Sequence, residues 1–430
     1  MATSRSAFSV LPATPGFARR LLTADLLSVG SELLAGETID TNAAELAREL
    51  TELGLRVGGI AAVPDELGAV HDAFARALQR SDVVISTGGL GPTPDDLTRE
   101  AIAAVVGETL VVDPGLERWL RDLWARREMA FPEINLKQAW LIPSSIALEN
   151  GNGTAPGWWV DRPDGRVVIA LPGPPREMRA MWIEVVLPRL RQRQAGRDVA
   201  VRTYRLTGIG ESQVADLLGE QMLRSTNPIV ATYARAEAVD VRISAVPVDD
   251  EDAAPSQPGG TAAQLLAEAE GTVLAALGEY IWATGRTTWA EAVDAALGDR
   301  GWTLATVEVG TRGTLAELLS NTTRLVVAES RATETGDQST GDVDRLAEEA
   351  RKTAGADVGV ALRIMARGED TAASVAISSP ERLHHERRVV FLGGSLGRSR
   401  AAITAASMLL RELQGELQRA GSASPTNGHR

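Results

Sequence analysis

The stretch STGGLGPTPDDLTREA, residues 86–101, places glycines and prolines ahead of two acids, directly after an apolar run. Gly88, Gly89 and Gly91 lack a Cβ, so an oxygen-rich ligand can come close to their backbone N–H groups. Where such a loop meets the start of a helix, these groups form an anion site, typically for phosphate. The same residue types also make a tight turn between a strand and a helix. The loop alone therefore predicts either a phosphate site or a turn.

Carboxylates near this loop favour the phosphate interpretation. Asp95 and Asp96 would repel a phosphate unless a divalent cation lay between them, and such hard cations prefer oxygen ligands. Glu32 and Asp65 follow the first and second predicted strands and are expected to reach the same crevice. We predict Glu32, Asp95 and Asp96 as metal ligands, and Asp65 and Asp96 as catalytic residues. The alternative for Asp96 is capping of the helix that follows.

The elements that must position these residues alternate between strand and helix. The pattern predicts strands at 24–30, 55–64, 82–89 and 166–171, and helices at 41–54, 67–81 and 97–107. This alternation implies parallel pairing through right-handed crossovers. Such a sheet binds ligands outside the carboxyl ends of its strands, where each conspicuous loop of this region lies. Four further residues in or beside these loops are predicted to contact phosphate or nucleotide: Thr87, Thr98, Asn42 and Gly173.

Composition limits the classes of protein to consider. A chain of 430 residues with 44% hydrophobic residues is long enough for two or three globular domains. It has no cysteine, which excludes disulfides, zinc thiolate sites and cysteine nucleophiles. The net charge of −13 disfavours nucleic acid as a partner. No apolar run reaches the roughly 18 residues of a membrane helix, and we expect a cytoplasmic protein. His384 and His385 lie in a stretch that is predicted to be a polar turn, so a histidine metal centre is not expected.

The whole chain is predicted to be a multidomain α/β protein. A flexible leader (1–22) precedes a three-layer domain with a parallel sheet (23–195). A small α+β module (196–283), a second α/β domain (284–420) and a disordered tail (421–430) follow.

Three ordered loops carry a family resemblance. GSELLAGETIDTN, STGGLGPTPDDLTREA and LPGPPREM together resemble the amino-terminal domain of the CinA family, which is related to molybdopterin-binding MoaB/Mog proteins. YRLTGIGESQVADLL resembles the KH-like middle module of the family, and the third unit resembles its carboxyl-terminal amidohydrolase domain. The resemblance implies hydrolysis of ADP-ribose by the first domain, deamidation of nicotinamide mononucleotide by the last, and a homodimer.

Individual positions can be carried over from the family. Gly88, Gly89, Gly91 and Asp96 match the motif of the related pterin proteins, Asp65 matches their other acid, and Thr41 and Asn42 fit the first loop of the family. The last domain departs from the pattern. The family motif there reads approximately Glu-Ser-Cys-Thr-Gly-Gly, whereas this chain has EVGTRG at 308–313. In the family motif the serine is the nucleophile, and Val309 stands at its position here. Valine cannot form a covalent acyl intermediate. Two further motif loops are replaced by LRIMARGED and AESRATETG. Deamidation is therefore predicted to be lost, and the domain to be structural or dimerising.

The leading hypothesis is a pyrophosphatase that uses Mg²⁺, Mn²⁺ or Co²⁺ and acts on ADP-ribose or a related small-molecule nucleotide. Pterin binding or adenylyl transfer needs the same anion loop and stays open. A non-catalytic scaffold is the third hypothesis. RNA binding by the middle module is disfavoured, because residues 200–283 have no Gly-x-x-Gly loop flanked by basic residues.

Overall fold

The computed structural model describes residues 19–234, 238–248, 259–332 and 343–415. The chain divides into two compact units, Met1–Ala200 and Val201–Arg430. The predicted leader up to residue 18, the predicted tail and most of the polar segment 249–260 lie outside the described residues.

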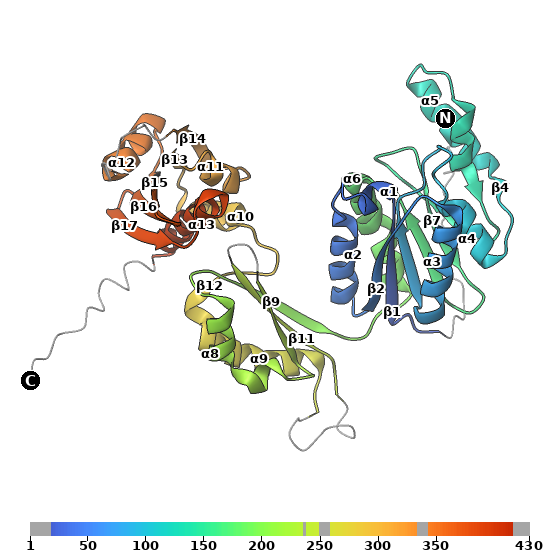
Figure 1. Cartoon of the computed structure of the whole chain (residues 1–430), viewed down its shortest axis with the longest axis horizontal. Helices are drawn as coiled ribbons and strands as arrows, with labels where there is room; N and C mark the ends of the chain where they lie inside the picture. Colours follow the sequence, from blue (N-terminus) through green and yellow to red (C-terminus); the bar gives the residue numbers. More distant parts are fainter. Residues whose placement is uncertain (1–18, 235–237, 249–258, 333–342, 416–430) are drawn as a thin grey trace, which may run out of the picture. The chain divides into compact units, whose positions relative to one another are not determined.

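The first unit contains a six-stranded sheet with the strand order β2-β1-β3-β8-β7-β6 (Figure 1). Its strands are β1 (Thr23–Val29), β2 (Arg56–Val63), β3 (Val83–Thr87), β6 (Ser145–Leu148), β7 (Gly157–Asp161) and β8 (Val167–Leu171). Its helices are α1 (Ser31–Leu34), α2 (Thr41–Glu52), α3 (Leu67–Arg80), α4 (Thr98–Val106), α5 (Pro114–Arg126), α6 (Pro175–Met181) and α7 (Leu187–Gln192). The shorter elements are β4 (Val111–Val112), β5 (Trp140–Leu141), the 3-10 helix η1 (Glu133–Ala139) and the π-helix η2 (Trp182–Val186).

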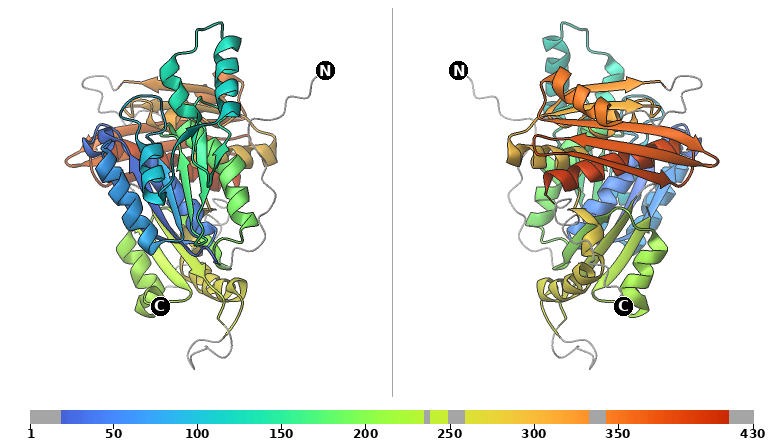
Figure 2. Two further views of the ribbon diagram at one scale, coloured as in Figure 1. Left: turned by 90° about the vertical axis from the view of Figure 1, so that its right-hand side faces the viewer. Right: turned by 90° about the vertical axis from the view of Figure 1, so that its left-hand side faces the viewer.

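Helices cover both faces of this sheet, as the three-layer prediction requires. Ile85 of β3 packs on one face in a core that α2, α6 and α7 complete, and Val84 packs on the other face beneath α3 and α4. All five residues of β3 are buried, because a strand in the middle of the sheet is covered on each side. Helix α5 stands out from this unit (Figures 1 and 2).

The sheet is mixed, not wholly parallel. Strands β2, β1, β3 and β8 are parallel to one another, whereas β7 is antiparallel to both β8 and β6. The connections 149–156 and 162–166 are too short for a parallel crossover, so each makes a hairpin. Residues directly ahead of β1, which begins at Thr23, also pack against this unit. Leu21 is fully buried, and Arg19 forms an ion pair with Asp82 at 2.6 Å.

The second unit begins with a four-stranded sheet in the order β10-β11-β9-β12. Its strands are β9 (Ala200–Leu206), β10 (Ile229–Ala234), β11 (Val239–Ala245) and β12 (Ile281–Thr284), and its helices are α8 (Glu211–Leu223), α9 (Ala262–Leu277) and the 3-10 helix η3 (Gly278–Tyr280). Thr261 begins α9 with a capping box to Gln264. This module matches the predicted α+β class.

The rest of the second unit is a five-stranded mixed sheet in the order β14-β13-β15-β16-β17. Its strands are β13 (Leu304–Val309), β14 (Leu325–Arg331), β15 (Val358–Arg367), β16 (Asp370–Ser378) and β17 (Leu383–Val390). Helix α12 (Val343–Ala354) covers one face, and α10 (Trp289–Arg300), α11 (Thr314–Leu318) and α13 (Gly394–Leu413) cover the other. The prediction of a turn at His384 and His385 is wrong, because both residues lie within β17 and pair with β16.

Candidate functional site

The four parallel strands of the first unit bring their following loops to one edge of the sheet. A cavity of about 400 Å³ lies at this edge. It is lined by eight of the eleven predicted site residues: Glu32, Asp65, Gly88, Gly89, Gly91, Asp95, Asp96 and Gly173. The structure therefore brings together the glycine loop and the acids that were predicted from separate loops.

The glycine loop has a conformation that larger residues cannot adopt. Gly88 has a φ of +94°, and a Cβ there would lie 2.1 Å from the carbonyl oxygen of Val29. Gly89 has a φ of +64°. The N–H of Gly88 donates to the carbonyl of Leu171 at 3.0 Å, but no acceptor among the described residues meets the N–H groups of Gly89, Leu90 and Gly91. Three consecutive N–H groups beside a cavity are suited to binding an anion.

Two of the acids also hold the loops of the cavity in place. The carboxylate of Asp65 accepts from the N–H of Ser31 at 2.7 Å, and Ser31 Oγ accepts from the N–H of Asp65 at 3.1 Å. The carboxylate of Asp96 accepts from the N–H of Thr93 at 2.8 Å and from the hydroxyl of the same residue. Asp96 lies against Gly91, where a Cβ would be 2.3 Å from the carboxylate. Each acid keeps further lone pairs for a ligand.

The other two predicted metal ligands are exposed at the rim of the cavity. Glu32 folds its carboxylate over Gly30, where a Cβ would lie 2.6 Å from Glu32 Oε1. Hydrogen bonding from Thr93 lowers the pKa of Asp95 below its ordinary value, so this side chain is ionised at neutral pH. Among the described residues, no three acidic or histidine side chains are close enough to hold a metal ion by themselves.

Three predicted ligand-binding residues support the loops from behind and do not line the cavity. Thr98 is fully buried, and its hydroxyl donates to the carbonyl of Gly88 at 2.9 Å. Asn42 is buried in α2, and its amide donates to the carbonyl of Gly173 at 2.7 Å. Thr87 is buried as the last residue of β3. The capping alternative for Asp96 is wrong, because α4 begins at Thr98 without a side-chain cap.

A buried arginine that the sequence reasoning missed supports the loop. Arg99 is inaccessible to solvent and donates to the carbonyls of Leu90 at 2.8 Å and Pro156 at 3.2 Å. Burial lowers the pKa of its guanidinium to about 10, which leaves it charged at neutral pH. This fixed positive charge lies beneath the segment that carries the unpaired N–H groups. Its position in the charged run TRE offered no signal, because Arg99 contacts Leu90, Pro156 and Trp158, two of which are distant in the sequence.

Three further cavity residues were also missed: Gln138, Thr154 and Glu177. Glu177 belongs to the LPGPPREM motif, so the sequence did offer a signal for it. Gln138 and Thr154 come from the region between α5 and β7, for which no elements were predicted.

The corresponding loop in the last domain has a different chemistry. Val309, the residue that the sequence resemblance matched to the nucleophile of the family motif, is buried at the end of β13. Glu308 is only 1% exposed. Its carboxylate accepts from the N–H groups of Leu315 at 3.0 Å and Ala316 at 3.1 Å, and from the hydroxyl of Thr311. The acid therefore holds the start of α11.

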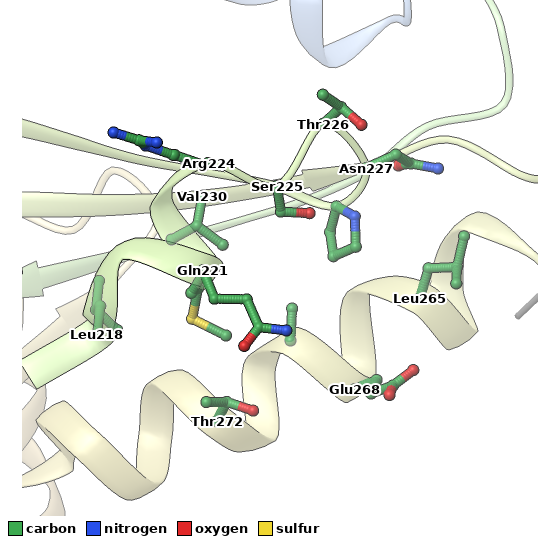
Figure 3. Close-up of a pocket in the computed structure, with 13 residues that line it drawn as sticks. Leu218, Gln221, Arg224, Ser225, Thr226, Asn227, Val230, Leu265, Glu268 and Thr272 are labelled. Atoms are coloured by element: carbon green, nitrogen blue, oxygen red, sulfur yellow. The ribbon is translucent and has the colours of Figure 1, made fainter. Parts of the chain in front are cut away.

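A second cavity, of about 560 Å³, lies in the middle module between α8, the segment 224–228 and α9 (Figure 3). Leu218, Val230 and Leu265 contribute apolar surface to it. Arg224 and Glu268 are the charged residues that line it, and Arg224 already pairs with Glu220. The lining therefore carries one charged residue of each sign. Across the described residues, no helix is both long enough and apolar enough to cross a membrane.

Comparisons with known proteins identify families for the first domain and for the middle module. One family model, described as "Probable molybdopterin binding domain", matches residues 25–192, and another, "Damage-inducible protein CinA KH domain", matches residues 201–283. A CinA-like protein of Deinococcus deserti is 42% identical over 409 residues, which cover 91% of this chain and 98% of that protein. A CinA-like protein of Deinococcus radiodurans is 48% identical over 304 residues, 70% of this chain and 72% of that protein. The chain in the crystal structure of CinA from Thermoplasma acidophilum is 36% identical in sequence to this chain. The match covers 40% of this chain and 99% of the Thermoplasma chain, with a TM-score of 0.36.

Proposed function

Because the chain belongs to the CinA family and carries a molybdopterin-binding-like domain, we propose that this domain is a divalent-cation-dependent pyrophosphatase. Its substrate is ADP-ribose or a related nucleoside diphosphate derivative. One observation carries the proposal: the unpaired N–H groups of residues 89–91 line the same cavity as Asp65 and Asp96.

The two sets of groups are suited to different parts of the reaction. The N–H groups of the glycine loop would bind the diphosphate and stabilise the charge that develops on its oxygens during attack. Asp65 and Asp96 would orient the attacking water and accept its proton, since no histidine in the described part of the chain lines the cavity. Water would attack one phosphorus, the bridging P–O bond would break, and the products would be AMP and ribose 5-phosphate.

The cavity suits a cation that is shared with the substrate better than one held by the protein alone. Mg²⁺ typically binds one or two carboxylates together with substrate phosphates and water. Glu32, Asp95 and Asp96 supply such carboxylates at the cavity, although no three acids of the described segments lie close enough to enclose a cation by themselves. When bound, the cation would neutralise phosphate charge and lower the pKa of the water molecule that it binds.

The test is release of AMP from ADP-ribose by the full-length protein with Mg²⁺, Mn²⁺ or Co²⁺, and with a chelator in place of the metal. Asp96→Ala is expected to reduce kcat/KM by at least about 100-fold, because it removes both the charge and the contact with Thr93. Asp96→Asn keeps an acceptor for Thr93 and removes only the charge. A comparable loss of kcat/KM in this variant would show that the charge of Asp96, and not its support of the loop, is needed for cleavage. Glu184→Gln, an exposed change outside the cavity, is the control. Wild-type activity in both Asp96 variants would refute the assigned role.

A second candidate is binding of a pterin or adenylyl transfer, which the match over residues 25–192 favours. The same anion loop would then bind the phosphate of a molybdopterin-like ligand. Binding of a pterin phosphate without release of AMP from ADP-ribose would support this candidate. If neither occurs, the scaffold hypothesis gains. We also propose that the last domain has lost deamidation and serves as a structural or homodimerising domain.

A further inference from the structure

One wall of the cavity differs chemically from the glycine loop. Glu177, in the first turn of α6, lines the cavity next to the segment 150–155. Its Oε2 accepts from Asn150 Nδ2 at 2.7 Å. Asn150 is 2% exposed and also donates to the carbonyl of Ala155 at 3.0 Å, so its amide is fixed in position. A neutral amide therefore orients the carboxylate without neutralising its charge.

Gly153 creates the space for this carboxylate. A Cβ at position 153 would lie 2.1 Å from Glu177 Oε2 and 2.6 Å from Asn150 Nδ2. Any side chain there would force the carboxylate or the amide to move. The close packing fixes one oxygen of Glu177 and leaves Oε1 without a hydrogen-bond partner among the described residues.

A hydroxyl donor lies on the same wall. Gln138 is 2% exposed, and its Nε2 donates to Thr154 Oγ1 at 3.3 Å, while its Oε1 accepts from Asn135 at 3.4 Å. Because Thr154 Oγ1 accepts a hydrogen bond from Gln138, its own proton is available to a ligand. Gln138 and Thr154 both line the cavity.

The wall thus offers an ionised acceptor, Glu177, and a hydroxyl donor, Thr154. An ionised carboxylate only accepts hydrogen bonds, so it repels phosphate and attracts groups that donate. A ligand with two adjacent hydroxyls could donate to Glu177 and accept from Thr154. Carboxylates bind ribose hydroxyls in this way in other nucleotide sites. The phosphates would occupy the glycine loop, where N–H donors are available.

We propose that Glu177 and Thr154 bind the cis-diol of a ribose that adjoins the diphosphate, and that Glu177 excludes ligands with a phosphate on that diol. This inference rests on the proposed function for the position of the diphosphate. It assigns the substrate class as a diphosphate with an unmodified ribose.

The experiment compares ADP-ribose with three analogues: two that each lack the 2-hydroxyl of one ribose, and 2′-phospho-ADP-ribose. The wild-type protein is expected to cleave one of the two deoxy analogues about 10- to 100-fold less efficiently than ADP-ribose, since a carboxylate acceptor loses its donor. If the diol belongs to the adenosine, the 2′-phosphate analogue is rejected as well. Glu177→Gln is expected to reduce this discrimination to about threefold or less, because a neutral amide neither attracts the diol as strongly nor repels phosphate.

Gly153→Ala is the second variant, and it should impair discrimination in the same direction by displacing the carboxylate. Glu184→Gln, on the neighbouring helical segment and exposed, is the matched control and should discriminate like the wild-type protein. Equal discrimination by Glu177→Gln and the wild-type protein would overturn the inference while leaving the pyrophosphatase proposal intact.

Binding separates the two proposals. Calorimetric titration of ADP-ribose and the analogues into the metal-free protein requires no cleavage. One outcome is that ADP-ribose binds to the wild-type protein but is not cleaved with any metal, and that Glu177→Gln weakens its binding at least as much as removal of the ribose hydroxyl does in the wild-type protein. In that case the diol contact stands and the pyrophosphatase proposal fails. If the wild-type protein neither binds ADP-ribose, with or without a divalent cation, nor cleaves it with any metal, both proposals fail.

Discussion

Two loops of the molecule have the same strand–glycine–helix arrangement but differ in the role of their carboxylates. In the first unit β3 leads through Gly88 into α4, and in the last domain β13 leads through Gly310, with a φ of +83°, into α11. Both loops follow buried strands and precede helices. Around the first loop, carboxylates line a cavity of about 400 Å³. In the second, Glu308 is buried against the backbone that it supports.

The comparison shows that a carboxylate after a strand is not sufficient for a site. Glu308 accepts three hydrogen bonds from its own loop and helix, so little of its capacity remains for a ligand. Asp65 and Asp96 also support backbone groups, but they remain at the cavity surface. The two loops therefore differ in whether the carboxylate can reach a ligand. They also differ in that the residue after Glu308 is Val309, which has no reactive group.

The largest expected contrast between the loops is in catalysis. Nicotinamide mononucleotide is expected to remain intact under conditions in which ADP-ribose is cleaved, because Val309 offers no nucleophile. Both substrates can be incubated with the full-length protein and the same metals, with ammonia and AMP measured in parallel. Release of ammonia above the protein-free level would refute the interpretation of the last domain as a lost deamidase.

A smaller contrast concerns stability. Glu308→Gln is expected to destabilise the last domain by about 2 kcal/mol, since the amide cannot accept every bond that the buried carboxylate accepts. Hydrogen exchange of the β13 and α11 amides would report this loss locally. Cleavage of ADP-ribose should be unchanged. Unaltered exchange in the variant would show that Glu308 does not have the supporting role described above.

The smallest expected effect is at the other end of β3 from the glycine loop. Burial raises the pKa of Asp82, but hydrogen bonds from Leu22, Arg19 and Thr23 outweigh it, so the pKa lies below the ordinary value of 3.8. A carboxylate with a lowered pKa in the folded state stabilises the fold above its unfolded pKa and loses this contribution as the pH falls through its folded pKa.

Asp82→Asn is therefore expected to destabilise the protein by about 1 kcal/mol at pH 7, and the difference from the wild-type protein should shrink below about pH 4. Thermal unfolding at a series of pH values measures this difference. Cleavage of ADP-ribose at pH 7 should be unaffected, because Asp82 does not line the cavity. A difference in stability that grows on acidification would contradict the assignment.

Much of the fold could be predicted from local patterns. The continuous apolar run of β3 predicted a strand covered on both faces, and the glycines at 88 and 89 predicted a backbone turn that both adopt with positive φ. The sequence pattern failed at β6 and β7, because the short connections on either side of β7 were not recognised as hairpins. The residues that contact a ligand were harder to predict than the elements that carry them.

The amino-acid sequence by itself determined which loops follow strand ends, and therefore that Asp65, Gly91 and Asp96 would share one edge of the sheet. Parallel strands bring their carboxyl ends together whatever the details of packing. Only the tertiary structure decided which polar groups reach the cavity. Thr98 is buried behind the loop and Glu177 lies on the cavity wall, because side-chain exposure depends on contacts between segments that are distant in the sequence.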